Sequence, residues 1–157
     1  MSTLLVYYSE NEQIRELCER SRMDGTATYE IREYFDRSPA YVATVGAYLA
    51  LTGKNTAIEK EKPDISEYDT IILASPVWAS GPAPAMNAFL RSTDLKGKEV
   101  IGILFKSGFS GALANDALRK RISLAGGACK GVVSIPKKEL LNKGEGLLNF
   151  AMKKVYC

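Results

Sequence analysis

The chain has 157 residues, of which 46% are hydrophobic, and a net charge of +3; this size suits a single domain, residues 1–157, with one substantial core. Basic and acidic residues alternate along the chain instead of forming a block, which argues against nucleic acid as a partner. No apolar run approaches the length of a membrane span and the N-terminus lacks a secretion signal, so we expect a cytoplasmic protein that binds no membrane.

The chain opens with a predicted strand and a predicted helix. Residues 3–8, TLLVYY, form an apolar run that is typical of a buried strand, and the polar residues 9–13 follow it as a loop. A helix then begins, because Ile14, Leu17 and Cys18 share one apolar face while charged residues take the other.

The next two elements are a strand and a helix. Residues 26–32 mix β-branched, aromatic and charged residues, which predicts an edge strand. Ser38 and Pro39 form the N-cap and first-turn signal of a helix that Gly53 ends. Its apolar residues recur at helical spacing: Val42, Val45 and Leu49. Residues 54–69 are charged and predict a surface connection.

The stretch DTIILASPVWASGPAPAMNAFL carries the most information. Residues 70–74 are continuously apolar, which predicts a strand in the middle of a sheet, and Pro76 is expected to end it. Pro82 and Pro84 suit the opening turn of the helix that follows. Between the strand and the helix lies Trp78, the only tryptophan of the chain. A strand, a tight loop and a helix start mark the edge where α/β sheets bind ligands.

The last third repeats the alternation. Residues 100–105 predict a fourth strand, which ends in the glycine-bearing loop KSGFSG, and residues 112–124 predict a helix. The apolar residues that we place on its inner face are Leu113, Ala117 and Leu118. Residues 131–135 predict the fifth strand and residues 140–155 the final helix. Five strands alternating with helices predict an α/β fold of three layers, with a doubly wound parallel sheet covered by helices on both faces.

The chemistry open to the chain is narrowed by its composition. Without histidine it lacks the usual general base and the commonest metal ligand, so we expect no metal site and no Ser-His-Asp hydrolysis. Cys18, Cys129 and Cys157 have no CxxC spacing and predict free thiols. The loop after the first strand lacks the glycines of a dinucleotide fingerprint, and no P-loop pattern is present.

Three segments together carry a specific resemblance: LLVYYS, SEYDTIILASPVWASGPAPAMNAFL and KSGFSG. Over essentially the whole length, the chain resembles short-chain flavodoxins. This resemblance implies the flavodoxin-like strand order 2-1-3-4-5 and FMN at the carboxyl edge of the sheet. It implies no catalytic side chain, and it implies cofactor-binding residues in the loops after strands one, three and four: Ser9, Glu10, Asn11, Glu12, Gln13, Ile14, Pro76, Val77, Trp78, Ala79, Ser80, Gly81, Ser107, Gly108 and Phe109.

The second and third of these loops suit a flavin. A planar isoalloxazine needs an aromatic face and close backbone approach, while the cofactor itself does the chemistry. Trp78 can supply the face, with a core or interface anchor as the other reading of this residue. Ser107, Gly108 and Phe109 can flank the other side of the ring.

The first loop departs from the flavodoxin pattern, which usually reads Ser or Thr, any residue, Thr, Gly, any residue, Thr. Ser9 matches, whereas Asn11, Glu12 and Ile14 stand for the first threonine, the glycine and the last threonine. Two donors are lost or altered, and the charge of the added carboxylates would weaken FMN binding about ten- to a hundredfold or more. The alternative reading of Glu10 and Glu12 is structural, because acids near a helix N-terminus favour its dipole.

Three functional hypotheses follow. The first is an FMN-dependent electron-transfer protein or small oxidoreductase that exchanges electrons with a redox partner protein or NAD(P)H. Its enzyme form would be an NAD(P)H-dependent quinone or nitro reductase. The second is a flavodoxin-like domain that has lost FMN and acts as a binding module, and the third is a pocket for riboflavin or another ligand without the phosphate. The sequence leaves open a monomer or a homodimer.

Overall fold

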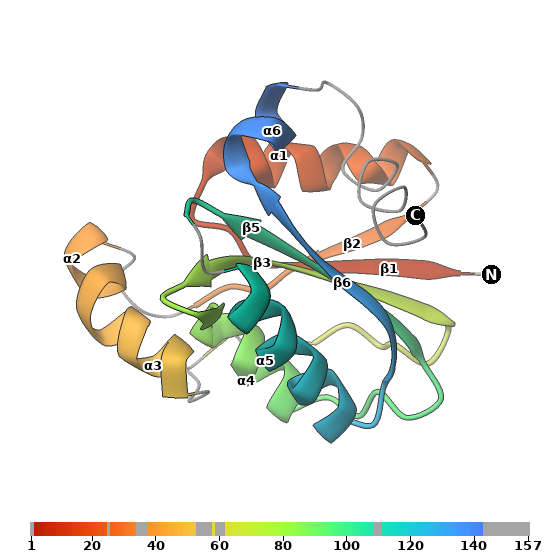
Figure 1. Ribbon diagram of the computed structural model, residues 1–157. Coiled ribbons are helices and arrows are strands. Elements are labelled where there is room, and N and C mark those ends of the chain that lie inside the picture. The colour runs from red at the N-terminus through yellow and green to blue at the C-terminus, as the bar shows by residue number, and fades with distance from the viewer. Residues whose placement is uncertain are drawn as a thin grey trace.

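The computed structural model describes residues 2–24, 26–33, 38–52, 58, 62–108 and 111–142. A twisted sheet runs through the centre, with helices on both of its faces (Figure 1). Its strands are β1 (Thr3–Tyr7), β2 (Ala27–Glu30), β3 (Thr70–Trp78), β4 (Gly81–Pro82), β5 (Glu99–Lys106) and β6 (Ala128–Pro136). The α-helices are α1 (Glu12–Arg20), α2 (Pro39–Tyr41), α3 (Ala47–Thr52), α4 (Pro84–Arg91), α5 (Gly111–Leu124) and α6 (Lys137–Asn142). A 3₁₀ turn (Ser21–Asp24) follows α1, and a π-helical turn (Val42–Gly46) joins α2 to α3.

The strand order confirms the predicted topology. The sheet runs β2-β1-β3-β5-β6, and all four of these neighbouring pairs are parallel. Counted among the parallel strands alone, this is the expected order 2-1-3-4-5. The strand predicted at residues 26–32 is β2, and it lies at the edge as expected. The added element is β4, which pairs antiparallel with the end of β3.

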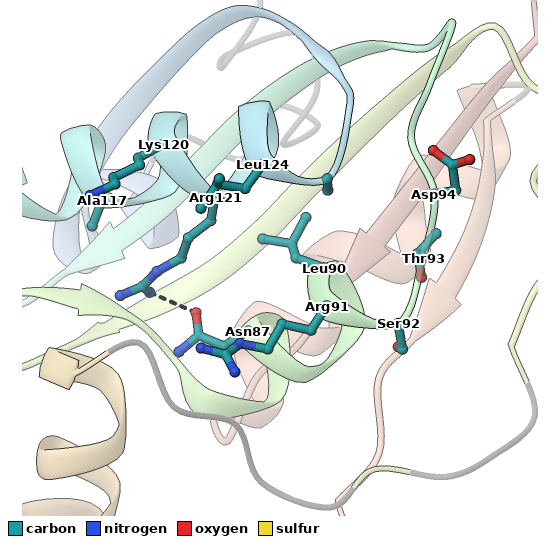
Figure 2. Close-up of a pocket in the computed structure, with 11 residues that line it drawn as sticks. Asn87, Leu90, Arg91, Ser92, Thr93, Asp94, Ala117, Lys120, Arg121 and Leu124 are labelled. Atoms are coloured by element: carbon teal, nitrogen blue, oxygen red, sulfur yellow. Dashed lines mark hydrogen bonds between the residues drawn. The ribbon is translucent and has the colours of Figure 1, made fainter.

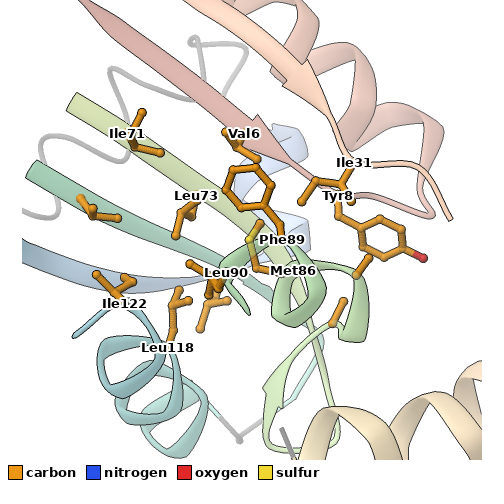
Figure 3. Packing of buried hydrophobic residues seen from close by; sticks show 14 of the residues in the cluster. Val6, Tyr8, Ile31, Ile71, Leu73, Met86, Phe89, Leu90, Leu118 and Ile122 are labelled. Carbon is orange, nitrogen blue, oxygen red and sulfur yellow. The ribbon is translucent and has the colours of Figure 1, made fainter. Parts of the chain in front are cut away.

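Two apolar cores form because successive side chains of a strand point to opposite faces. Along β1 and just beyond it, Leu4, Val6 and Tyr8 join the core under α4 and α5, part of which Figure 3 shows. Leu5 and Tyr7 join the opposite core, together with apolar residues of α1 and α6. The inner strands are thus buried on both faces, as their unbroken apolar runs predict.

The expected end of the central strand was wrong. β3 continues through Pro76 to Trp78, and Pro82 belongs to β4 instead of the helix, which begins at Pro84. Proline is tolerated here because β1 pairs with β3 no further than Ala74, so Pro76 has a strand neighbour only on the β5 side, opposite Phe105.

Two predicted helix faces were also partly wrong. Val45 is 48% exposed, and the π-helical turn in which it lies departs from the 3.6-residue spacing by which we grouped it with Val42 and Leu49. Leu113 is 65% exposed, whereas Ala114, Leu118 and Ile122 are buried and follow each other at four-residue steps.

Two further predictions concern segments that the structure describes only in part. The final helix begins three residues earlier than predicted, at Lys137, and residues 143–157 lie outside the described residues. Within the predicted surface connection at residues 54–69, residues 54–57 and 59–61 lie outside them too. Among the helices that the structure describes, none is both long enough and apolar enough to span a membrane.

Candidate ligand site at the carboxyl edge

Three loops meet at one edge of the sheet because β1, β3 and β5 are parallel neighbours. The first loop, residues 8–11, leads from β1 into α1. The second is the hairpin between β3 and β4, and the third begins at Ser107 after β5. The three segments from which we predicted the binding residues are therefore brought to the same edge, at the left of Figure 1.

The first loop is closed by its own side chains. The Ser9 hydroxyl donates to the Asn11 carbonyl over 2.9 Å and accepts from the Asn11 amide over 3.0 Å. Asn11 is the N-cap of α1, and its Oδ1 accepts from the amides of Gln13 and Ile14 over 2.9 and 3.2 Å. The Ile14 side chain is fully buried in the core beneath α1. This loop is thus a well-formed helix start in which the amides of Asn11, Gln13 and Ile14 are already paired.

The acidic residues of the first loop are paired with bases. Glu12 contacts the Arg15 guanidinium at 2.7 Å, and Arg15 also contacts Glu30 of β2 at 2.8 Å. Glu10 lies 3.4 Å from the amine of Lys137, the first residue of α6. The Arg15 guanidinium further donates to the Ser9 carbonyl over 3.2 Å. Ion pairs therefore connect this segment to β2 and to α6.

The Trp78 side chain at the end of β3 points into the fold. Only 4% of the residue is exposed, and its ring meets that of Tyr8 edge to face, with centroids 5.8 Å apart and planes at 73°. Its buried indole Nε1 has no hydrogen-bond partner among the described residues. An unsatisfied buried donor costs about 1 to 3 kcal/mol, so this atom marks a place where an acceptor is missing.

The hairpin after Trp78 has a strained backbone, and hydrogen bonds of a buried serine hydroxyl hold it. Ala79 has φ of 56°, a left-handed conformation in a residue other than glycine. Beneath it, the buried hydroxyl of Ser75 accepts from the Ala83 amide over 3.0 Å and donates to the Pro76 carbonyl over 3.0 Å. Sequence reasoning missed this role of Ser75, because the bond joins residues eight positions apart and no local pattern predicts it.

The predicted second-loop residues differ in exposure. Pro76 and Gly81 are buried, Val77 and Ser80 are half-buried, and Ala79 is exposed. In the third loop, Ser107 and Gly108 are exposed, while Phe109 lies outside the described residues. A ligand at this edge would thus first meet the hairpin tip and the start of the third loop.

A cavity of about 880 Å³ lies elsewhere, between α4 and α5 (Figure 2). None of the residues lining it belongs to the three loops.

Within this cavity, the guanidinium of Arg121 donates to the Asn87 amide oxygen over 2.6 Å. Burial, and secondly the nearby charge of Arg91, lower the pKa of Arg121. Sequence reasoning missed this cavity, which depends on contacts between residues more than thirty positions apart. Arg91 and Arg121 also lie in last helical turns, where cations favour the helix dipole.

The chain was compared with known proteins. A family model described as flavodoxin matches residues 50–142. Among curated proteins, the comparison finds no match. In fold, the chain is similar to a protein from Bacteroides eggerthii assigned as a flavoprotein, with TM-score 0.77 and 18% identity over 99% of this chain and 98% of that one.

Two further structures are similar. A flavoprotein from Lactobacillus acidophilus, solved in complex with FMN, has TM-score 0.68 and 19% identity, covering 86% of this chain and 91% of that one. The oxidised flavodoxin 1 of Bacillus cereus has TM-score 0.55 and 16% identity, covering 99% and 98%. Because the flavodoxin family model matches more than half of the sequence, the chain belongs to the flavodoxin family.

Proposed function

We propose that this chain is a flavin-binding electron carrier that holds the isoalloxazine ring at the carboxyl edge, between the β3–β4 hairpin and the loop after β5. The observation that carries the proposal is the buried indole N–H of Trp78, which has no partner among the described residues and lies at this edge. FMN is one candidate flavin, because the Lactobacillus acidophilus flavoprotein is in complex with it.

Two features of this edge support binding of the ring half of a flavin. The strained turn at Ala79 resembles the strain that ligand clamps store, and a side chain at Gly108 would meet no described residue within 4 Å. Stacking on Trp78 requires the indole to leave its contact with Tyr8, because only 4% of Trp78 is exposed. The phosphate half of FMN does not fit the first loop, in which the amides of Asn11, Gln13 and Ile14 already have partners.

A bound flavin would supply the redox chemistry, and the chain would bind the ring, orient it and limit water around it. An electron carrier needs no protein acid or base, which suits a chain without histidine. The carboxylates of the first loop are engaged with Arg15 and Lys137. A redox partner protein would exchange electrons at the exposed hairpin tip. The free thiols Cys18 and Cys129 suit a reducing, cytoplasmic location.

Reconstitution separates a carrier from an enzyme. The purified chain is titrated with riboflavin and with FMN, and flavin fluorescence is followed at micromolar concentrations. The flavin-loaded protein is then reduced with light, with EDTA as the electron donor, and mixed with a one-electron acceptor such as cytochrome c. In its oxidised form it is mixed with NADPH. We expect quenching on binding, rapid reoxidation by the acceptor and no bleaching by NADPH. Absence of binding by both flavins overturns the proposal, whereas bleaching by NADPH favours the reductase.

A further inference from the structure

The first loop bears on which part of a flavin this chain would bind, a question that rests on the function proposed above. We infer that the site takes flavins by the isoalloxazine ring and gains little from the 5′-phosphate, so that riboflavin and FMN bind with similar affinity. Three observations carry this inference: the pairing of the backbone amides, the state of the side-chain donors, and the pairing of the bases near the first loop.

Three of the backbone amides that could hold a phosphate are in use. Ser9 occupies the amide of Asn11, and the side chain of Asn11 occupies those of Gln13 and Ile14. A helix N-terminus binds anions through unpaired N–H groups, and here the N-cap satisfies two of them. A phosphate would have to displace the Asn11 side chain, exchanging two existing hydrogen bonds for new ones.

Two hydroxyl positions of the flavodoxin pattern, Ser9 and Ile14, offer no free donor here. The Ser9 hydroxyl has one proton, which it donates to the Asn11 carbonyl, and only 2% of this residue is exposed. Ile14 is fully buried and carries an alkyl group where the flavodoxin pattern has its last hydroxyl. Neither residue can donate to a phosphate without rearrangement of the loop.

The bases near the first loop are already paired with acids. Glu10, Glu12 and Glu30 contact Arg15 and Lys137, and Glu30 also contacts Arg32 at 3.6 Å. Each base already contacts at least one carboxylate, at 2.7 and 2.8 Å for Arg15 and 3.4 Å for Lys137. A phosphate would have to compete with these acids for the same two bases.

The direct test compares the two flavins on the unaltered chain by isothermal titration calorimetry. We expect the dissociation constants of riboflavin and FMN to agree within about threefold, a difference well under one tenfold step of affinity. FMN binding that is about a hundredfold tighter than riboflavin binding would overturn the inference and leave the proposed function intact. If neither flavin binds, the proposed function itself falls and the inference with it.

A double variant, Asn11→Gly with Glu12→Gln, tests the cause. Glycine is well tolerated at an N-cap and would free the amides of Gln13 and Ile14, while glutamine removes one opposing charge. We expect the ratio of FMN to riboflavin affinity to rise about tenfold or more. The matched control is Glu16→Gln, which removes an exposed charge from the outer face of the same helix and should leave the ratio unchanged. Circular dichroism checks that each variant folds, and an unchanged ratio in a folded double variant would contradict the inference.

Discussion

The rings of Tyr8 and Trp78 meet edge to face, with their centroids 5.8 Å apart, and so connect the first loop to the end of β3. Tyr8 follows β1 and is fully buried, so the same contact anchors the first loop in the core under α4. Two of the three loops at the carboxyl edge are therefore linked by one aromatic pair. A ligand that moves the indole must also disturb the segment that leads into α1.

The emission of Trp78 should report on this pair, because the chain has no other tryptophan. We expect Tyr8→Ala to shift the emission to longer wavelength, since loss of the neighbouring ring admits water, and to destabilise the fold by about 3 to 5 kcal/mol. Tyr8→Phe keeps the ring and should retain the short-wavelength emission of a buried indole. Identical spectra for the two variants would contradict the packing described here.

Replacing Ala79 with glycine should relieve backbone strain in the hairpin. Its φ of 56° is disfavoured for a residue with a side chain. We expect Ala79→Gly to raise the free energy of unfolding by about 0.5 to 1 kcal/mol, as measured by urea denaturation. Ala117→Gly in the middle of α5 is the control, and it should lower stability by about 1 kcal/mol. Loss of stability in both variants would show that the turn is not strained.

Gly102 in β5 should not tolerate a side chain. An added Cβ would lie 2.6 Å from Cδ2 of Leu118 and 3.0 Å from Cγ2 of Val132. We expect Gly102→Ala to destabilise the fold by about 1 to 3 kcal/mol in urea denaturation. Gly108→Ala meets no atom of the described residues within 4 Å, so it should change stability by no more than about 0.5 kcal/mol. Equal stability of the two variants would mean that α5 packs less closely on β5 than we describe.

Alkaline solution should destabilise the fold through two buried groups under α1. Burial, followed by the charges of Glu19 and Glu30, raises the pKa of Cys18 above its ordinary 9.0. Burial, followed by the hydrogen bond to Glu19, raises the pKa of Tyr7 above its ordinary 10.0. Both pKa values are higher in the folded state than in the unfolded chain. The stabilisation that the two groups provide is therefore complete at pH values below their unfolded pKa values, and it is lost as the pH rises above them.

The unfolded chain therefore releases these protons first as pH rises above 9.0. The free energy of unfolding should then fall by up to about 1.4 kcal/mol per pH unit for each group. Tyr7→Phe should make this fall less steep above 10.0, where Tyr7 begins to contribute. If the free energy of unfolding falls equally steeply with pH in the unaltered chain and in Tyr7→Phe, the pKa of Tyr7 is not raised by folding.

Much of the architecture could be predicted because it depends on local composition. The unbroken apolar runs at residues 3–8, 70–74 and 100–105 identify strands that are covered on both faces, and the mixed residues 26–32 identify an edge strand. With the flavodoxin resemblance, these runs gave the correct order of the parallel strands.

The errors occur where tertiary contacts override a local signal. Proline at position 76 indicates a strand end, yet β3 continues because β1 stops pairing at Ala74. Leu113 is apolar but lies outside, because Ala114, Leu118 and Ile122 bring α5 close to the sheet. In the candidate site, the sequence showed the departure from the flavodoxin loop, but the pairing of Glu10 with Lys137 joins residues far apart in the chain and could not be predicted.

The most direct test of the central claim is a nuclear magnetic resonance titration of the ¹⁵N-labelled chain with riboflavin. We expect shifts at the indole N–H of Trp78, at Ser80 and at Ser107, which all lie at the carboxyl edge. The amide resonances of residues that line the α4–α5 cavity, such as Ala117, should not shift. Shifts confined to that cavity, or none at saturating riboflavin, would contradict a flavin site between the β3–β4 hairpin and the loop after β5.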